Sequence, residues 1–386
     1  MFLLMMQKYI QLPFYVKLTC TLVSILLLGW FAIIGQTILI PLILGFLISI
    51  LLVPFCNLLE RYLFLPRVVA SIVTTSLFSG LIVGIFYLLI NQLLDISDEW
   101  PGFQAQVIEL FETVQRWIHH NFGITSRMQM NFLNDNLSKT FDFGTIFIER
   151  ILGGLTRYSI LILFTFLYVV FILIYRRHLI RFVFYIFHER KHKHVLSVIY
   201  TTQHMVKQYL IGLFLQMLIV FSLSFIAFTI LGIKYSFVLA LMTGIFNIIP
   251  YVGIIISLII SIILTLATAA PSQALLLLLA FIIVHAIDGN IVMPKIVGSK
   301  VKVNSLIVII GLVIGEMTWG IMGMFLSIPI LAMIKIIFDH IPELKPWGFL
   351  LGEEKSERLN PNVEQYFRKN RRIFFKKQEK KETNDN

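Results

Sequence analysis

Long runs of apolar residues alternate along this chain with short polar segments. Six of the runs are uninterrupted, and each has at least the roughly 17 residues that a helix needs to cross a bilayer. They are Leu18–Ile34, Thr37–Cys56, Val68–Leu94, Leu155–Tyr175, Tyr209–Leu231 and Ala274–Met293. A helix satisfies its own backbone hydrogen bonds in lipid, where no water is present to do so. The pattern therefore predicts six transmembrane helices.

Two further apolar runs are interrupted in the middle. Phe237–Leu266 is broken at Asn247–Pro250, and Leu306–Ile337 is broken around Gly315–Gly320. Each run is long enough for one tilted helix, or for two half-length helices that fold back as a re-entrant hairpin. Together, the eight hydrophobic segments predict an all-α polytopic membrane protein with six full transmembrane helices and two broken or re-entrant segments.

Composition supports a membrane protein over a soluble one. Of the 386 residues, 58% are hydrophobic and 14% are charged, with a mean hydropathy of +0.86, whereas soluble domains average about 25% charged residues. The net charge of +11 lies mainly in short loops and the C-terminal tail, so membrane topology explains it better than nucleic-acid binding. Cys20 and Cys56 lie in apolar runs, so we expect no disulfide. The start of the chain, Met1–Leu18, does not resemble a cleavable signal peptide, because Lys17 interrupts it and no small-residue cleavage site follows.

The distribution of charge predicts the orientation, because Lys and Arg concentrate in cytoplasmic loops. The segment Arg176–Lys207 holds seven Lys and Arg residues against one acid, Glu189, so we expect it in the cytoplasm. Counting back through four spans places the N-terminus in the cytoplasm and Asp95–Arg150 outside. The C-terminus is cytoplasmic whether the broken segments cross fully or fold back.

This topology divides the chain into four parts. Residues 1–94 form an N-terminal three-span segment, residues 95–150 a small extracytoplasmic helical domain, residues 151–341 the core region, and residues 342–386 a charged cytoplasmic tail. Within the core region, residues 181–207 are predicted to form an amphipathic helix along the inner membrane surface.

The second half of the chain contains a candidate internal repeat. Two sets of glycines recur at intervals of 12 and 9 residues in one set and 13 and 9 in the other; they are Gly232, Gly244 and Gly253, and Gly298, Gly311 and Gly320. Many secondary transporters repeat a span and a broken segment with inverted topology around a midplane site. Lys295, Lys300 and Lys302 lie outside if both broken segments cross fully and in the cytoplasm if both are hairpins, so the charge pattern favours hairpins. Chance spacing of glycines remains the alternative.

Ionisable residues inside the apolar runs are few, and each is a functional candidate because a charge at membrane depth costs about 2.5 kcal/mol or more. His285 and Asp288 lie one turn apart and share a helix face; Asn290 and Lys295 follow, and Glu316 stands alone in the second broken segment. Burial favours the neutral form of a carboxyl group unless a cation is close. Asp288 and Glu316 are therefore candidate carriers of a proton or Na⁺, tuned by His285 and Asn290. In the structural alternative, Asp288 pairs with Lys295 and Glu316 faces a neighbouring helix.

The break in the first interrupted run forms a second candidate site, made of Asn247, Pro250, Tyr251 and Gly253. Proline lacks a backbone N–H group and blocks the carbonyl four residues earlier, which leaves polar backbone groups free at membrane depth. Such backbone is tolerated only inside protein or beside a water-filled cavity. It can bind small ions or polar solutes, or it can form a kink satisfied by Asn247 and Tyr251.

No pattern predicts enzymatic chemistry. His188, His192 and His194 lie among basic residues, which favours a solvated loop over a metal site. No nucleophile–base pair, phosphate-binding glycine loop or metal-ligand spacing rises above chance. We therefore expect no enzymatic activity, no cofactor and no metal.

Several of these segments resemble the signatures of one bacterial membrane protein family, the AI-2E family, named for autoinducer-2 export. Phe246–Gly253 resembles F-N-x-I-P-Y-x-G, and Asp288–Gly298, which contains Pro294, resembles acid-G-N-x-x-x-P-K-x-x-G. Gly320–Pro329 is similar to the closing G-x-x-G-x-x-x-x-x-P, and Tyr209–Gly212 fits the pattern at the start of its span. The order, spacing and hydropathy agree over about residues 10 to 345.

This resemblance implies a homo-oligomeric transport protein of the bacterial inner membrane. Family members are credited with exporting autoinducer-2 or with exchanging Na⁺ or Li⁺ for H⁺. The motifs transfer candidate roles to Asn247, Pro250, Tyr251, Gly253, Asp288, Asn290, Pro294 and Lys295. Two positions depart from the family pattern, because Ser305 replaces a usual proline and Glu316 a usual small residue. The additional acid favours cation or proton coupling and weakens a transfer of the autoinducer-2 role.

We therefore expect a proton- or cation-coupled transporter, whose partners are the lipid bilayer and a small polar solute or a monovalent cation. Its site would lie between the Asn247–Gly253 break and a face carrying Asp288 and Glu316, with alternating access around it. Two alternatives are an oligomeric channel lined by the acids, and a scaffold that binds a partner through Asp95–Arg150.

Overall fold

The computed structural model describes residues 13–98, 116, 120, 159–268, 271–298 and 303–353. These residues are helical apart from turns and one antiparallel bridge between Val303 and Gly352. The main helices in chain order are α1 (Phe14–Ile34), α2 (Gln36–Tyr62), α3 (Arg67–Asp98), an unlabelled helix (Ser159–Ile186), α6 (His192–Ile230), α7 (Ser236–Phe246), α8 (Val252–Thr268), α9 (Pro271–Ile287), α10 (Ser305–Trp319), α11 (Ile321–His340) and α12 (Lys345–Leu351). Two π-helical turns, η3 (Asp288–Val292) and η4 (Pro294–Gly298), follow α9.

The all-helical membrane class is confirmed. Among the described residues, seven helices are long and apolar enough to cross a membrane. Six of them coincide with the predicted spans, and the seventh is α11, the second arm of the second interrupted run. The predicted count of six full spans is therefore not confirmed, because α11 alone has 20 residues and is about 30 Å long.

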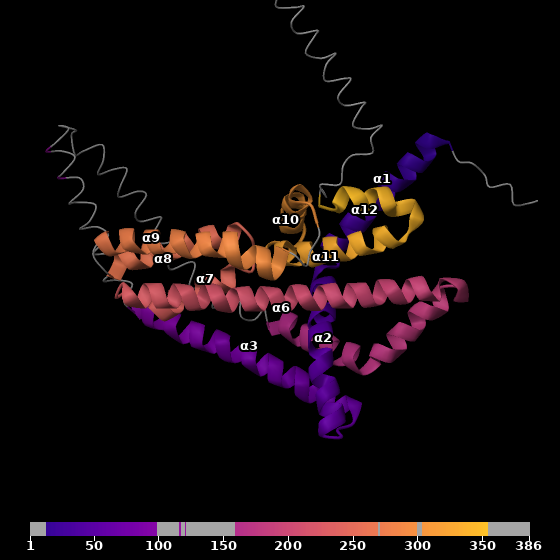
Figure 1. The fold of residues 1–386 in the computed structure, drawn as a ribbon, viewed down its shortest axis with the longest axis horizontal. Coiled ribbons are helices and arrows are strands. Elements are labelled where there is room, and N and C mark those ends of the chain that lie inside the picture. Colours follow the sequence, from indigo (N-terminus) through magenta and orange to yellow (C-terminus); the bar gives the residue numbers. More distant parts are fainter. Residues whose placement is uncertain are drawn as a thin grey trace, which may run out of the picture.

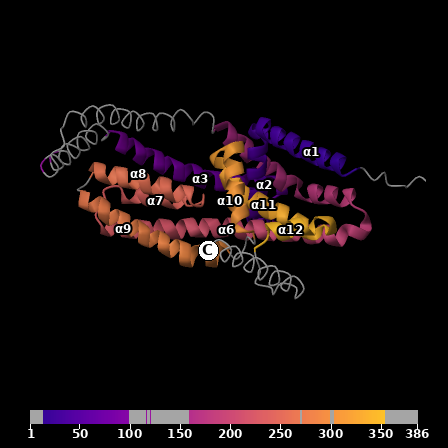
Figure 2. The same cartoon turned by 90° about the horizontal axis from the view of Figure 1, so that it is seen from above.

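The longest described helix, α6, runs through the middle of the fold (Figure 1). Helices α7, α8 and α9 lie along its C-terminal half, whereas α2 and α11 contact its N-terminal half. Figure 2 shows the same division from a perpendicular direction. The chain therefore has two packed halves that share one helix.

Each half has its own hydrophobic core. Near the N-terminal end of α6, buried Val206 and Tyr209 pack with Leu47 of α2 and Leu326 of α11. Near the C-terminal end, Phe228 packs with a second set of buried side chains, namely Ile233, Leu239, Ala240, Leu264, Leu277 and Phe281. The middle residues of α6 therefore lie between the two cores and connect them along one helix.

The first interrupted run folds into a hairpin of α7 and α8. Helix α7 has 11 residues and is about 17 Å long, which is too short for a hydrocarbon core of about 30 Å. The turn contains Tyr251 in a left-handed conformation, with φ 66°. A Cβ atom at Gly253 would overlap the carbonyl group of Phe246, so only glycine permits the two arms to meet this closely. The predicted break at Asn247–Pro250 is confirmed.

The second interrupted run also folds back, at Gly320, whose φ of 61° is readily adopted only by glycine. Helices α10 and α11 lie in backbone contact, because a Cβ atom at Gly315 or Gly323 would overlap the facing glycine. The Ser327 hydroxyl donates to the carbonyls of Gly311 and Gly323, both at 2.7 Å. Small residues that bring backbones together are typical of helix packing in membranes.

The order of elements fits the predicted repeat, which stays a prediction. Helix α6 precedes the α7–α8 hairpin, α9 precedes the α10–α11 hairpin, and α9 runs antiparallel to α6 in both views (Figures 1 and 2).

The predicted amphipathic helix over residues 181–207 is not one helix. The structure assigns its first part to the end of Ser159–Ile186 and its second part to α6, with a turn and the short 3₁₀ segment Glu189–Lys191 between them. The turn packs on itself, since the His192 ring meets Phe184 edge-on and contacts backbone carbonyls of Phe184 and Phe187. The predicted extracytoplasmic domain lies almost entirely outside the described residues, as does most of the tail.

Replacing Gly323 with alanine is expected to destabilise the α10–α11 hairpin. The added methyl group would force the two backbones apart, at a cost of about 1–3 kcal/mol. We expect a lower melting temperature for the purified protein in detergent. Gly84→Ala is the matched control, because no atom lies within 4 Å of a Cβ at that position. Equal melting temperatures for the two variants would contradict the tight contact.

Candidate functional site

A buried carboxylate lies where the two halves of the fold meet. Asp288 is 3% exposed and accepts three hydrogen bonds from two neutral amides. The Gln216 side chain of α6 donates to both carboxylate oxygens at 3.0 Å, and the Asn247 side chain donates to Oδ2 at 3.0 Å. These three side chains, which we call the Asp288 cluster, join α6, the α7–α8 turn and the segment after α9.

Local backbone features place these three side chains together. Gln216 lies in the middle of α6, between the buried residues Leu213 and Val220. Asn247 directly follows α7, where the helix ends at the turn. Asp288 begins the first π-helical turn, a wider and rarer helix form that is frequent at functional sites. Pro294 begins the second such turn and cannot donate the backbone hydrogen bond of a regular α-helix.

The electrostatic setting of Asp288 is unusual. Among the described residues it forms no ion pair with Lys or Arg, so its charge is balanced only by amide dipoles. A buried ionised carboxylate carries a desolvation penalty that pairing with a cation or hydrogen bonding must offset. The cluster is therefore suited to take up a positive charge, either a proton or a small cation.

His285 lies one turn before Asp288, as predicted, but does not bond to it. Its ring packs against Phe281 with centroids 4.3 Å apart, and both ring nitrogens are buried with no hydrogen-bond partner among the described residues. An unpaired buried polar group is costly. The unpaired ring therefore marks a position where a proton, water or solute would gain hydrogen bonds.

Asn290 and Lys295 do not contact Asp288. Asn290 is exposed and its side chain donates to the Ala286 carbonyl at 2.8 Å, which supports the backbone where the helix widens. Lys295 is also exposed. The alternative in which Asp288 pairs with Lys295 is not present in this structure.

The remaining motif residues lie at turns, at a helix end or inside a helix. Pro250 is half-buried and Tyr251 is 57% exposed at the α7–α8 turn. Gly298 ends the second π-helical turn, and Pro329 is buried inside α11. With Gly253 and Gly320 at the hairpin turns, these positions explain why the motifs are rich in proline and glycine.

Glu316 does not join the Asp288 cluster. It lies on an exposed part of α10, one turn before the Gly320 turn. The adjacent Trp319 indole donates to the Ala32 carbonyl of α1 at 2.9 Å, which ties the end of α10 to the end of α1. Among the described residues no contact joins Glu316 to Asp288, so a face shared by the two acids stays a prediction.

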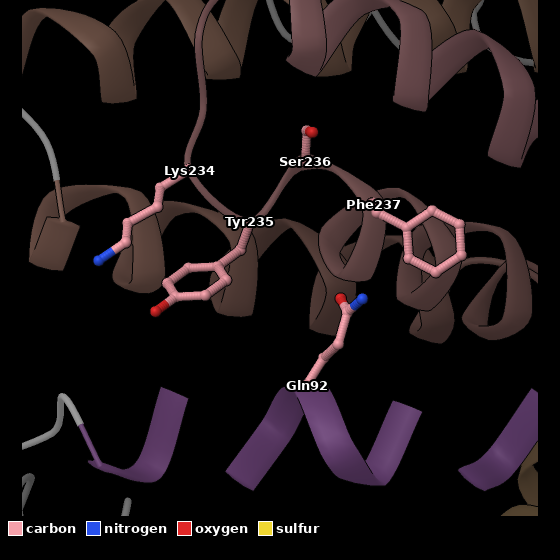
Figure 3. Close-up of a pocket in the computed structure, with 5 residues that line it drawn as sticks. All are labelled: Gln92, Lys234, Tyr235, Ser236 and Phe237. Carbon is pink, nitrogen blue, oxygen red and sulfur yellow. The ribbon is translucent and has the colours of Figure 1, made fainter. Parts of the chain in front are cut away.

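A separate pocket of about 280 Å³ lies at the other end of α7 (Figure 3). Its lining residues are Gln92, Lys234, Tyr235, Ser236 and Phe237. Gln92 of α3 points toward the α6–α7 loop in the close-up, where Lys234 and Tyr235 extend to one side and Phe237 to the other. Helix α7 thus begins at this pocket and ends at Asn247 of the Asp288 cluster.

Gln216 was not among the residues predicted from the sequence. The signal was available, because a glutamine stands alone within a long apolar run and polar side chains at membrane depth are expensive and often functional. Its partner could not be inferred, since 72 residues separate Gln216 from Asp288.

Hairpins that meet a long helix around a buried, unneutralised carboxylate are typical of membrane transport proteins. The comparison with protein families agrees with this class. The sequence model of the AI-2E family transporter matches residues 21–343, and the chain belongs to this family.

Individual relatives are transport proteins by name. The chain is 27% identical over 364 residues to YrrI of Bacillus subtilis (strain 168), named as a candidate transport protein; the match covers 88% of this chain and 99% of YrrI. It is 28% identical over 127 residues to the AI-2 transport protein TqsA of Escherichia coli (strain K12), a match that covers 33% of this chain and 37% of TqsA.

Replacing Gln216 with alanine is expected to destabilise the protein through Asp288. The carboxylate would lose one of its two amide donors, at a cost of about 1.5–3 kcal/mol for a bond to a charged group. Thermal unfolding in detergent would measure the loss. Gln208→Ala is the matched control on the same helix, because Gln208 bonds at the surface to His204.

A double substitution tests whether the effect passes through Asp288. In an Asp288→Ala background, Gln216→Ala should cost less than in the natural protein, with a coupling of about 0.5–3 kcal/mol. Strictly additive losses would show that the two side chains act independently.

Proposed function

We propose that this protein is a cation- or proton-coupled membrane transporter in which Asp288 is the coupling group. The observation that carries the proposal is the burial of this carboxylate against two neutral amides, with no cationic side chain paired to it among the described residues. A carboxylate held in this way is stabilised when it binds a proton or a small cation. Binding and release of that proton or cation at each turnover would couple the cluster to an ion gradient.

The cluster joins three elements whose relative movement would open and close the site. Gln216 belongs to α6, Asn247 to the α7–α8 turn, and Asp288 to the π-helical segment. Protonation of Asp288 weakens its attraction for two N–H donors, because a neutral carboxyl is a poorer acceptor than a carboxylate. Loss of that attraction frees the hairpin to move against α6. The structure, with Asp288 3% exposed, corresponds in this proposal to an occluded state.

Two cargoes are compatible with this mechanism. The first is a small polar solute exported against a proton or cation gradient, which the name of TqsA supports for one relative. The second is direct exchange of Na⁺ or Li⁺ for H⁺ at Asp288 itself. In either case we propose a homo-oligomer in the bacterial plasma membrane, with both termini in the cytoplasm.

The second candidate function is an oligomeric channel. The exposed position of Glu316 favours it, since an acid on an outer face of one chain can line a path between copies. Flux that runs only down its own gradient, without dependence on a counter-ion, would support the channel over the transporter.

Asp288→Asn is expected to abolish ion coupling. The asparagine keeps the size of the side chain but cannot take up and release a proton as a carboxylate does. In proteoliposomes with a pH-sensitive dye inside, an imposed Na⁺ or Li⁺ gradient should move protons in the natural protein and not in the variant. For an organic cargo found by export profiling of a deletion strain, the pH dependence of transport should disappear.

The control is Glu343→Gln, which removes an exposed carboxylate outside the spans and should leave coupling intact. Glu316→Gln tests the second predicted acid, and we expect a smaller effect than at Asp288 because Glu316 is exposed. Normal coupling in Asp288→Asn would end the proposal.

A cysteine at position 295 tests the proposed orientation. In a background with Cys20 and Cys56 replaced by serine, Lys295→Cys should react with a membrane-impermeant maleimide in inverted vesicles and not in intact cells. Lys234→Cys, at the opposite end of α7, should show the reverse pattern. Labelling of both from the same side would contradict the topology.

A further inference from the structure

A second polar cluster lies at the turn between α2 and α3 and is not part of the proposed transport site. The Arg176 Nη2 atom of helix Ser159–Ile186 donates to both oxygens of Glu60 at 2.8 and 2.9 Å and to Asn57 at 2.9 Å. Arg67, the first residue of α3, approaches the same carboxylate at 3.8 Å. Two arginines thus share one acid, and the group carries one uncompensated positive charge.

Hydrogen bonding in this cluster is incomplete. The Arg67 Nε and Arg176 Nη1 atoms are buried and find no hydrogen-bond partner in the part of the chain that the structure describes. Among the described residues, the Arg67 guanidinium has no ionic partner closer than Glu60 at 3.8 Å. Its location adds to the imbalance, because the N-terminus of a helix disfavours a cation and favours an anion. An anionic group with several acceptor oxygens would satisfy both guanidiniums, and arginine binds phosphate in this forked way.

The surroundings favour a phosphate attached to lipid. Both α2 and α3 are candidate membrane spans, so the turn between them lies at a membrane surface. Large apolar side chains close to the cluster in sequence are exposed, namely Phe55, Leu58, Tyr62, Leu63 and Phe64. Phe64, which is 87% exposed, adopts φ 53°, a conformation that residues with a Cβ rarely adopt. The acyl chains of a bound phospholipid would cover this apolar surface. A free phosphate ion has no acyl chains and would leave it uncovered.

We propose that Arg67 and Arg176, with Glu60 holding them in place, bind the phosphate headgroup of an anionic phospholipid. Basic groups between transmembrane helices are suited to such headgroups. The headgroup would bridge α3 and helix Ser159–Ile186 at the turn that α2 makes into α3. This site is independent of the Asp288 cluster, and its test is a binding measurement that requires no transport.

The test compares lipids on the purified full-length protein in detergent. Phosphatidylglycerol should raise the melting temperature, and native mass spectrometry should detect it bound, whereas phosphatidylcholine should do neither. Arg67→Gln should weaken the phosphatidylglycerol effect at least about fivefold, which corresponds to about 1 kcal/mol for one cation near the membrane surface. This substitution leaves the Arg176–Glu60 pair intact, so the fold is preserved.

Arg61→Gln is the matched control, because Arg61 is exposed in the last turn of α2 and lies outside the cluster. It should bind phosphatidylglycerol like the natural protein. Equal effects of the two lipids on the natural protein would overturn the proposal, and this comparison needs no variant. Equal losses of phosphatidylglycerol binding in Arg61→Gln and Arg67→Gln would also overturn it. A stabilisation that inorganic phosphate reproduces in full would also overturn it, in favour of a free-anion site.

Discussion

The constraint around which this fold is organised is a carboxylate, Asp288, that is enclosed in an apolar bundle and pairs with no Lys or Arg among the described residues. Asp288 remains buried only because Gln216 and Asn247 both turn their amide N–H groups toward it. Each of the three comes from a different element, so the cluster exists only when α6, the α7–α8 turn and the π-helical segment are in register. A change in the charge of Asp288 therefore affects how these three helical elements pack against one another.

The two hairpins differ in how firmly their arms are joined. In α10 and α11 the backbones touch at Gly315 and Gly323, and Ser327 bonds to carbonyls of both helices. In α7 and α8 the backbone approach at a glycine is at the turn, where a Cβ atom at Gly253 would overlap the Phe246 carbonyl. The second hairpin is thus built as one unit, while the first carries the polar residue that reaches the cluster. This difference suits a rigid α10–α11 hairpin beside an α7–α8 hairpin that moves in the proposed mechanism.

The sequence predicted most of the fold because lipid makes hydropathy a strong signal. The six uninterrupted runs, the break at Asn247–Pro250 and the turn at Gly320 all follow from apolar length and from the backbone chemistry of proline and glycine. The candidate site was only partly predictable. Asp288 and Asn247 were both candidates and are hydrogen-bonded to each other, whereas Gln216 was missed and Glu316 is exposed on α10; the functional role of these residues stays a prediction. Hydropathy shows that a polar residue is buried in an apolar run, yet it does not show which helix faces it. The segment 181–207 was misread for a related reason, since charge periodicity does not reveal where a helix ends.

The continuity of α6 has a mechanical consequence. Its 39 residues pass through both cores without a described break, and Gln216 lies between them. A rod of this kind cannot tilt or roll at one end without transmitting the displacement to the other. We therefore expect a movement of the helices packed on one half of α6 to displace those packed on the other half.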